Sequence, residues 1–307
     1  MKTLTPTVPG NYRLLYVLPF MLVMSTLLIP IFTGFSWEMV ALCVGSYYLR
    51  MFGITAGYHR YFAHRSYKTS RVFQFMLAFL AQTSGQKGTL WWAWHHRHHH
   101  KYSDTVYDTH SPVKHSFFWS HMGWIMSADF VEPELEKVKD LTRYPELVFL
   151  HKNDYLPPVA YALAITALWG WEGLLWGFFI STALLYHGTF TINSLAHVFG
   201  SKRYVTGDES RNNAFLALLT MGEGWHNNHH YYQASARQGF YWWEVDMSYM
   251  ILKVLSWLGI VWDLKVPSQR VLEGGRSGHR LAEAEPEGES LLDPTLEPAL
   301  SVSKAHS

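Results

Sequence analysis

The stretch from Leu14 to Trp37 carries no charged residue, and it limits the possible folds of this 307-residue chain more than any other feature. A helix of about 20 apolar residues crosses a hydrocarbon core about 30 Å thick. The run contains Pro19 and Pro30, and no small-residue cleavage pattern follows it, so we interpret it as a membrane span and not as a cleavable signal peptide. Charged residues make up only 16% of the chain, which also favours a membrane protein, whereas a mean hydropathy near zero indicates that much of the chain lies in water.

Further apolar stretches complete two helical hairpins. Met39–Tyr58 is interrupted only by Arg50, and a later uncharged region is divided only by Trp171-Glu172-Gly173. A third apolar segment, Val72–Leu80, is too short to span a bilayer. The fold class that we predict is therefore an all-α membrane protein with four transmembrane helices, at about residues 14–35, 39–58, 155–171 and 173–196.

The distribution of Lys and Arg predicts the orientation. The two hairpin tips carry neither residue, whereas residues 1–13, residues 59–154 and the region after His197 carry nearly all of them. By the positive-inside rule, both termini and the long central loop are cytoplasmic. We therefore expect a cytoplasmic N-terminus (1–13), one domain over residues 14–273 whose cap comprises 59–154 and 197–265, and a disordered tail over 274–307 that is rich in Pro, Glu, Gly and Ser. Within the cap, residues 244–263 are typical of an amphipathic helix.

Composition also excludes some classes of function. The single cysteine, Cys43, rules out disulfides within the chain and a thiolate-held iron–sulfur cluster. A net charge of +1 gives no indication of the basic surface that nucleic-acid binding requires.

Histidines are grouped in a way that favours a metal centre. In the run from His95 to His100, the residues His96, His99 and His100 have the i, i+3, i+4 spacing that places side chains on one helical face. The group His226, His229 and His230 repeats this spacing, His59 and His64 form another group, and Asn193 and His197 stand at the cytoplasmic end of the last span. Crowding neutral imidazoles on one face has no benefit without a metal, for which imidazole is the commonest side-chain ligand.

Nine such histidines are too many for one tetrahedral zinc, which takes three or four protein ligands. Two metals with four or five nitrogens each would use them all. Iron is the natural choice for such sites, although imidazole also suits zinc and copper. Only one Glu-x-x-His pair occurs, Glu223 with His226, so the centre differs from the carboxylate-rich sites of soluble di-iron bundles.

The isolated histidines are interpreted as structural or as bystanders: His110, His115, His121, His151, His187, His279 and His306.

These motifs resemble those of the membrane fatty acyl desaturases of the stearoyl-CoA (delta-9) type. The resemblance rests on His59-Arg-Tyr-Phe-Ala-His64, His96-Arg-His-His99-His100, Asn193-Ser-Leu-Ala-His197 and Gly222-Glu-Gly-Trp-His226-Asn-Asn-His229-His230, in this order. The resemblance covers roughly residues 12–265 and includes the segments Gly53–Gly57, before the first motif, and Ser120–Trp124, after the second. Gln233–Arg237, after the last motif, is similar to the bacterial branch, which has no fused cytochrome b5.

The resemblance implies a cytoplasmic helical cap that holds two irons. One would be bound by His59, His64, His96, His100 and His229, and the other by His99, His197, His226 and His230, with Asn193 reaching it through water. It further implies an O2-dependent oxidoreductase that introduces a cis double bond, usually at delta-9, into a saturated long-chain acyl group held in a kinked tunnel. The residues at the kink would be Gln86, Trp92 and Thr189.

Positions that hold the CoA head group in animal members differ here. Lys87 replaces an Asn, Phe190 replaces a Trp, and Trp94-His95 and Ala128-Asp129 replace pairs that contain the cationic phosphate contacts. The acyl carrier therefore stays open between CoA, membrane lipid and a carrier protein.

Electrons must come from a separate protein, because the chain has no fused haem domain. We expect a ferredoxin or a cytochrome b5-like donor that docks on the cytoplasmic face of a bacterial cytoplasmic membrane, and Lys101 and Lys114 are candidate contacts.

Two other functions are consistent with the histidine groups. One is a related membrane di-iron hydroxylase or alkane monooxygenase, which differs from a desaturase in its product. The other is a non-enzymatic zinc-binding membrane protein, although transporters place their ligands near the bilayer midplane and these histidines gather at one end of the spans.

Overall fold

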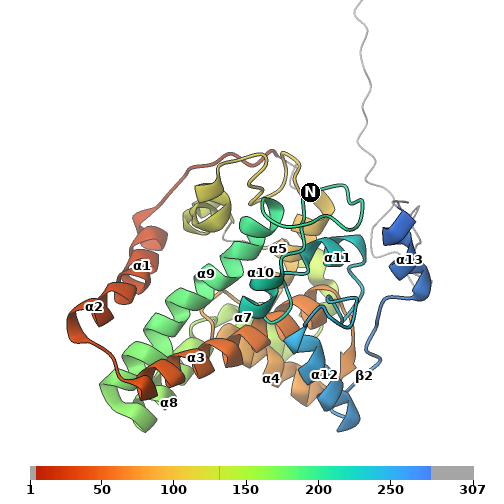
Figure 1. Ribbon diagram of the computed structural model, residues 1–307. Coiled ribbons are helices and arrows are strands. Elements are labelled where there is room, and N and C mark those ends of the chain that lie inside the picture. The colour runs from red at the N-terminus through yellow and green to blue at the C-terminus, as the bar shows by residue number, and fades with distance from the viewer. Residues whose placement is uncertain (1–4, 131, 278–307) are drawn as a thin grey trace, which may run out of the picture.

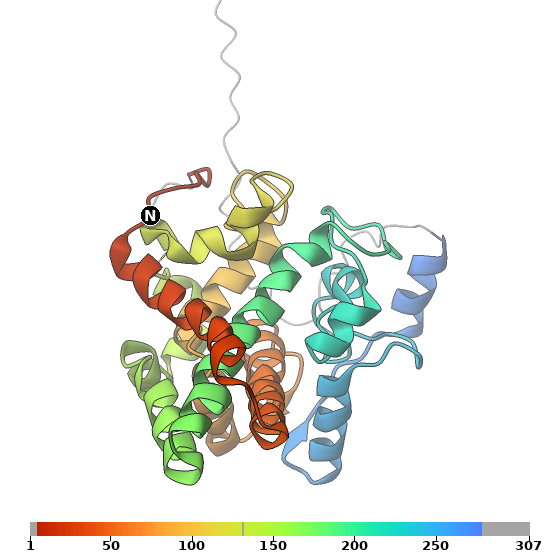
Figure 2. The same ribbon diagram turned by 60° about the vertical axis from the view of Figure 1, so that its left-hand side comes forward.

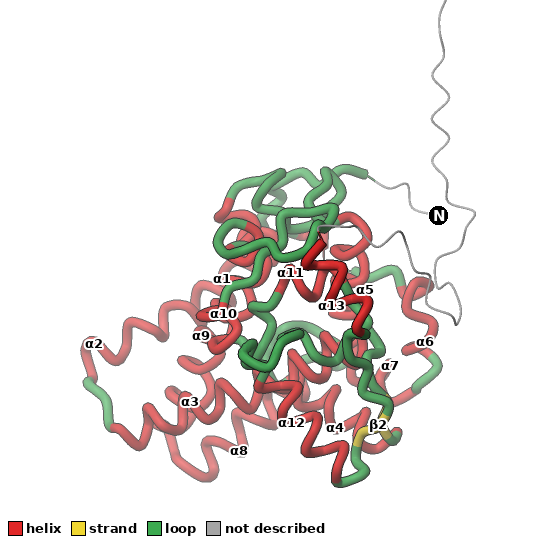
Figure 3. The backbone as a smooth tube through the Cα atoms, turned by 45° about the vertical axis from the view of Figure 1, so that its right-hand side comes forward, coloured by secondary structure: helices red, strands yellow, loops and turns green. Residues whose placement is uncertain are grey.

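The computed structural model describes residues 5–130 and 132–277, and this part of the chain is almost entirely helical. Two short strands, β1 (Lys68–Thr69) and β2 (Val261–Trp262), pair antiparallel with Lys68 opposite Trp262 (Figure 3). The predicted all-α character is confirmed.

Three helical stretches are long and apolar enough to cross a membrane. The first, Leu14–Thr33, comprises α1 (Leu14–Ser25), η1 (Thr26–Leu28) and α2 (Ile29–Thr33). The second, Trp37–Ala63, comprises α3 (Trp37–Phe52) and the π-helix η2 (Gly53–Ala63). The third, Leu156–His197, comprises α8 (Leu156–Gly173), the π-helix η7 (Leu174–Ile180), α9 (Ser181–Asn193) and η8 (Leu195–His197).

The third stretch reverses direction about a third of the way along its length. Gly170 has φ 63° and ψ −154°, a conformation that favours glycine. A Cβ atom on Gly173 would lie 3.2 Å from the carbonyl oxygen of Ile165, and one on Gly177 would lie 2.9 Å from the Ile165 side chain, so the two arms pack antiparallel. The turn therefore occurs at Gly170, one residue before the tip expected at Trp171–Gly173.

The remaining elements surround the ends of these stretches. They are α4 (Arg71–Gln82), α5 (Thr89–Tyr102), η3 (Trp119–Gly123), η4 (Trp124–Met126), η5 (Ala128–Phe130), η6 (Leu135–Val138), α6 (Lys139–Thr142), α7 (Pro145–Lys152), α10 (Ala214–Leu219), α11 (His226–Tyr231), α12 (Met247–Trp257) and α13 (Gln269–Ser277). Helix α12 lies within the predicted amphipathic segment. Helix α13 includes the first residues of the predicted disordered tail, and the rest of that tail lies outside the described residues.

Side-chain caps fix where several helices begin. Ser36 accepts a hydrogen bond from the amide of Met39 at the start of α3, and Ser70 does the same for Phe73 at the start of α4. Such caps satisfy amides that have no partner inside the helix. The interruption at Gly34–Ser36 therefore gives a short connection between the first two apolar stretches.

Both hairpin tips lie at the same end of the molecule. Figures 1 and 2 place the loop after α2 beside the turn at the end of α8, whereas the histidine-bearing helices α5 and α11 lie toward the other end of α3 and α9. The arrangement brings motifs that are far apart in the sequence to one end of the apolar helices.

A buried arginine joins the two hairpins. Arg50 in α3 is fully buried, donates to the hydroxyls of Ser181 and Thr182 in α9, and lies 5.1 Å from the ring centre of Tyr161 in α8. Because both hydroxyls also donate to backbone carbonyls of their own helix, they can accept from Arg50 without losing a partner. Arg50 thus fixes α3 against the second hairpin.

Candidate metal centre

The π-helix η2 explains how the first two histidines meet. Residues five apart on an α-helix point about 140° away from each other. In η2 the amide of His64 instead bonds to the carbonyl of His59 at 3.1 Å, so each turn holds one residue more and both side chains face the same side. Such π segments are frequent at functional sites. The sequence spacing alone did not predict this element.

We call the first cluster the five-histidine site. His59 lies in η2 and His64 directly follows it, His96 and His100 lie in α5, and His229 lies in α11. Their potential ligand atoms lie within 4.8 Å of one another. The Nε2 atoms face inward, with separations of 2.9 Å between His59 and His229 and 2.8 Å between His64 and His96. These are the five residues that the resemblance assigned to one metal.

The second cluster, the four-histidine site, lies beside the first. It comprises His99 of α5, His197 of η8, and His226 and His230 of α11, again with ligand atoms within 4.8 Å of one another. The Nε2 atoms of His197 and His226 are 3.0 Å apart, and Nε2 of His230 is buried with no hydrogen-bond partner among the described residues. The two clusters adjoin because α5 and α11 each contribute to both.

The residues present fit two metal ions. A metal–nitrogen bond of about 2.1 Å at right angles puts neighbouring ligand nitrogens about 3 Å apart, as the Nε2 atoms are here. Burial, reinforced by the neighbouring histidines, lowers the pKa of His96, His100 and His229 well below its ordinary value, so these rings are neutral. Neutral rings whose lone pairs converge are stabilised by a cation between them.

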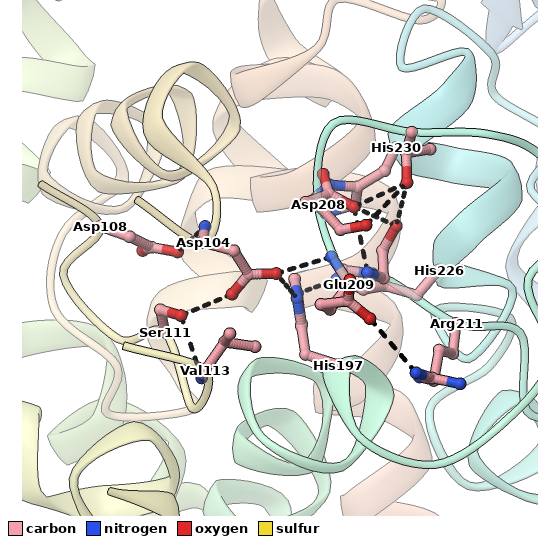
Figure 4. A network of polar contacts seen from close by, with 12 residues as sticks. Asp104, Asp108, Ser111, Val113, His197, Asp208, Glu209, Arg211, His226 and His230 are labelled. Carbon is pink, nitrogen blue, oxygen red and sulfur yellow. Dashed lines mark hydrogen bonds and ion pairs between the residues drawn. The ribbon is translucent and has the colours of Figure 1, made fainter. Parts of the chain in front are cut away.

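Four carboxylates contact the outer nitrogens of the clustered histidines: Asp104, Asp108 and Glu223 are buried, and Asp208 is partly buried. Sequence patterns did not single them out as partners of the histidines. Nδ1 of His99 lies 3.0 Å from Asp108 Oδ1. Nδ1 of His197 lies 2.9 Å from Asp104 Oδ2, and Nδ1 of His230 lies 2.6 Å from Asp208 Oδ2 (Figure 4). His59 pairs with Glu223.

This pattern fixes the tautomer of these four rings. A carboxylate that accepts from Nδ1 leaves Nε2 free for a metal, and it raises the basicity of the ligand.

The aspartates are ionised despite their burial. Burial alone would raise the pKa of Asp104, but the hydrogen bonds from His197 and Ser111 lower it to about 2. The same balance, set by His99 and His230 respectively, holds the pKa of Asp108 and of Asp208 well below its usual range. The outer side of the four-histidine site is therefore anionic.

Asp108 also lies near His110, which together with His99 forms a third group of potential ligands. The Nδ1 atom of His110 is 3.9 Å from Asp108 Oδ1, whereas Nδ1 of His99 is 3.0 Å away. Since the proton on His99 Nδ1 already occupies this carboxylate, we interpret the group as support for His99 and not as a further metal site.

Two glycines allow the segment Gly222–His230 to fold tightly. Gly222 has φ 119°, and a Cβ atom there would overlap the carboxylate of Asp246. A Cβ atom on Gly224 would overlap the backbone of Ala217 within α10. The close approach positions Glu223 toward His59 and places His226 at the first residue of α11.

The other two histidines of the central run lie outside both clusters. His98 faces the carbonyl oxygen of Tyr107 at 3.0 Å, and His95 packs against Trp91 with ring centres 4.1 Å apart. The isolated His187 of α9 pairs with His121 at 3.0 Å. The structure therefore groups His96, His99 and His100 with the other clustered histidines and leaves His95 and His98 outside both clusters.

A cavity of about 330 Å³ adjoins the five-histidine site. Its walls come from α1, from the turn before α5, from α5 itself and from α9, and it reaches His96 and Asn193. Gln86 donates to Thr189 across it at 3.0 Å, and Trp92 stacks on His96 with ring centres 4.9 Å apart. All five residues suggested for substrate contact line this cavity: Gln86, Lys87, Trp92, Thr189 and Phe190.

Comparison with known proteins is consistent with this geometry. The family model described as fatty acid desaturase matches residues 35–253. The chain is 39% identical over 246 residues to the sn-1 stearoyl-lipid 9-desaturase of Synechocystis sp., covering 78% of this chain and 75% of that protein. It is 37% identical to the sn-1 stearoyl-lipid 9-desaturase of Anabaena variabilis, covering 78% and 88%. It is 36% identical to an acyl-CoA C20 Delta5-desaturase of Anemone leveillei, covering 76% of each chain.

Proposed function

The chain belongs to the fatty acid desaturase family, and from that premise we propose that it introduces a cis delta-9 double bond into a saturated long-chain acyl group of a membrane lipid. That it is a fatty acyl desaturase, and so an oxidoreductase, follows from the family and from the names of its relatives. The bond position and the acyl carrier are the parts that we propose.

The observation that carries the proposal is the apolar cavity that ends at a metal-ligand candidate. An acyl chain in this cavity would pass Trp92 and reach the ring of His96. The Gln86–Thr189 hydrogen bond crosses the cavity and is placed to set a bend in the chain. We propose that Phe190, which packs against Phe20 of α1, holds α1 over the acyl chain.

We propose that the two histidine clusters hold two iron ions, with Asn193 contributing through a water molecule at the four-histidine site. Desaturases generally use two irons, and when bound these supply the oxygen-activating chemistry that removes hydrogen from the acyl chain. The overall reaction converts the saturated acyl group, O2, two electrons and two protons into the unsaturated acyl group and two molecules of water. The role of the chain itself is to orient the nine imidazoles and to keep water away from the acyl carbons.

Charge in the cavity lining supports a lipid-linked substrate. Among the described residues that line the cavity, Lys87 is the only lysine or arginine. The several phosphates of CoA would need more than one cation, whereas an acyl ester in a membrane lipid brings no such charge to the cavity. The two relatives that act on stearoyl lipid support the same choice, while the relative from Anemone leveillei keeps acyl-CoA as the alternative.

We further propose that the two arms that meet at Gly170 are separate spans, so that four helices cross the membrane with both termini and the metal centre in the cytoplasm. A separate donor, ferredoxin or a cytochrome b5-like protein, would dock on this face, where Lys101 and Lys114 are exposed. A bacterial cytoplasmic membrane fits this arrangement.

The test is expression in a host that makes no unsaturated fatty acids, followed by gas chromatography of its lipids. A delta-9 monounsaturated product would support the proposal. Hydroxylated lipids without new double bonds would favour the hydroxylase, and stoichiometric zinc with no oxygen-dependent product after iron reconstitution would favour the zinc-binding alternative. Purified protein supplied with reduced ferredoxin should then act on saturated phosphatidylglycerol in vesicles, and activity on stearoyl-CoA alone would overturn the lipid assignment.

A further inference from the structure

Carboxylates are distributed unequally between the two histidine clusters. At the four-histidine site, three of the four rings have an aspartate on Nδ1, and the aspartates are Asp104, Asp108 and Asp208. At the five-histidine site only His59 has a carboxylate partner, Glu223, while the Nδ1 atoms of His100 and His229 are buried with no partner among the described residues. The two metal positions therefore have different surroundings.

The carboxylates at the two clusters also differ in whether an arginine or lysine balances their charge. Glu223 shares the guanidinium of Arg60 with Asp246, at 3.2 and 2.9 Å respectively, so much of its charge is balanced. Within the described part of the chain, no lysine or arginine forms an ion pair with Asp104, Asp108 or Asp208. Instead these aspartates accept from the amides of Glu209, Asp104 and Ser210 and from serine and threonine hydroxyls. Neutral donors hold the carboxylates in place and leave their charge directed at the histidines.

Nearby lysines and arginines are occupied by a different carboxylate. Lys202 and Arg211 both pair with Glu209, which lies beside Asp208 in the sequence and, within the described part of the chain, forms no ion pair with a histidine. Figure 4 shows the contact between Glu209 and Arg211. Glu209, whose charge is balanced by Lys202 and Arg211, thus lies next to Asp208, whose charge is not balanced by a lysine or arginine of the described residues.

We infer that Asp104, Asp108 and Asp208 are positioning residues that make the four-histidine position the more electron-rich of the two metal positions, so that it favours the higher oxidation state of the metal. The inference rests on the proposed two-iron function. Three carboxylates behind the ligands increase the negative charge that the imidazoles present to a cation, and outer partners of this kind change metal affinity by about 10- to 100-fold. The five-histidine position has one histidine more but only one, largely neutralised, carboxylate behind its histidines.

The sharpest variant is Asp104→Asn. An amide oxygen in the place of Oδ2 still accepts from His197 Nδ1 and from the amide of Glu209. The new NH2 group faces the hydroxyl of Ser111, 2.5 Å from Oδ1. Ser111 already accepts from the amides of Val113 and Lys114, so the substitution removes the charge, keeps the hydrogen bonds from His197 and Glu209, and alters only the contact with Ser111. Glu209→Gln is the matched control, because it removes a carboxylate of the same region that touches no histidine.

Ferrous iron would be titrated anaerobically into the metal-free full-length protein, and the iron-57 form would be examined by Mössbauer spectroscopy and redox titration. For Asp104→Asn we expect about 10- to 100-fold weaker binding at one of two positions, a changed signal from that iron alone, and a higher reduction potential for it. Asp208→Asn, measured in parallel, should change the same iron, which keeps the test valid if one variant fails to fold. Glu209→Gln should match the unsubstituted protein.

Unchanged affinity and spectra in both aspartate variants, or equal changes at both irons, would overturn the inference. Its failure is distinguishable from failure of the proposed function. A protein that makes unsaturated lipid but has two equivalent irons refutes only the inference. A protein that binds two unequal irons and makes no unsaturated lipid refutes only the proposed function.

Discussion

Asp140 joins the first two histidine motifs, and its removal should be measurable. Arg97, which lies between His96 and His98, donates to both carboxylate oxygens of Asp140 at 2.9 and 2.8 Å. It also donates to the carbonyl of Phe62 at 2.7 Å and to that of Ala63 at 3.1 Å. The guanidinium thus connects α5 to the end of η2, next to His64. We choose Asp140→Asn because it removes one charge without changing the size of the side chain.

The magnitude follows from the burial of the pair. The side chains of Arg97 and Asp140 are 24% and 20% exposed, so their interaction lies between a surface pair, worth about 0.2–1 kcal/mol, and a buried charged hydrogen bond, worth about 1.5–3 kcal/mol. Arg65 binds the same carboxylate at 2.6 Å and loses its partner as well. We expect a cost of about 1–3 kcal/mol, and a melting temperature lower by about 2–10 °C on the scale of a domain of this size.

The pH dependence gives the prediction a second test. Burial alone would raise the pKa of Asp140, but Arg97 and Arg65 outweigh it and lower the pKa below its ordinary value. A carboxyl whose pKa is lowered by folding stabilises the protein above its unfolded pKa of about 3.9 and loses that contribution as the pH falls through the folded value. The difference between the unsubstituted protein and Asp140→Asn should therefore be the same at pH 7.5 and 5.5 and shrink only below about pH 4.

Thermal unfolding in detergent, followed by tryptophan fluorescence, measures this difference. Glu136→Gln is the control, because its ion pair with Lys139 is largely exposed and should contribute nothing measurable. Equal melting temperatures for Asp140→Asn and the unsubstituted protein would refute the reasoning. A difference that already disappears at pH 5.5 would assign the effect to a group other than Asp140.

Other substitutions test the site directly. His99→Ala should abolish desaturation and His98→Ala should retain much of it, as measured by lipid chromatography, and equal losses would contradict the assignment of the central run. Gly224→Ala should prevent both the folding of the segment Gly222–His230 and the binding of two metals per chain, and normal metal content would contradict the predicted overlap with Ala217. Removal of metal by a chelator should lower the melting temperature and its restoration should raise it, because the folded site binds cations that the unfolded chain does not.

Residues within one helix were predictable from the sequence, because their relative positions follow from helical geometry. The spacing of His96, His99 and His100 placed them on one face of α5, and the structure has them there. His59 and His64 do not share a face on an α-helix, so their convergence depends on the π-helix η2. Their grouping could be expected from the resemblance to a family, but not from α-helical spacing.

Contacts between distant segments were beyond sequence patterns. Asp208 is 22 positions from His230, and Asp104 is 93 positions from His197. Aspartate is common in loops, so neither residue is distinctive until the fold brings it to a histidine. The hairpin tip was expected at Trp171–Gly173 because Glu172 is the charged residue there. The backbone instead reverses at Gly170, whose positive φ favours glycine.

The number of charged groups around the two clusters explains why the clusters lie at one end of the apolar helices. Four buried or partly buried carboxylates, together with Arg60 and Arg97, accompany the nine histidines. Charges of this number in the middle of a hydrocarbon core would have a large desolvation cost. The cap formed by α5, α11 and the surrounding loops provides backbone amides and hydroxyls to satisfy them, while the helices beneath provide the apolar walls of the cavity. Only at this boundary can a strongly charged histidine site adjoin an apolar cavity, and Trp92 and His96, which line the cavity, are the residues at which the two environments meet.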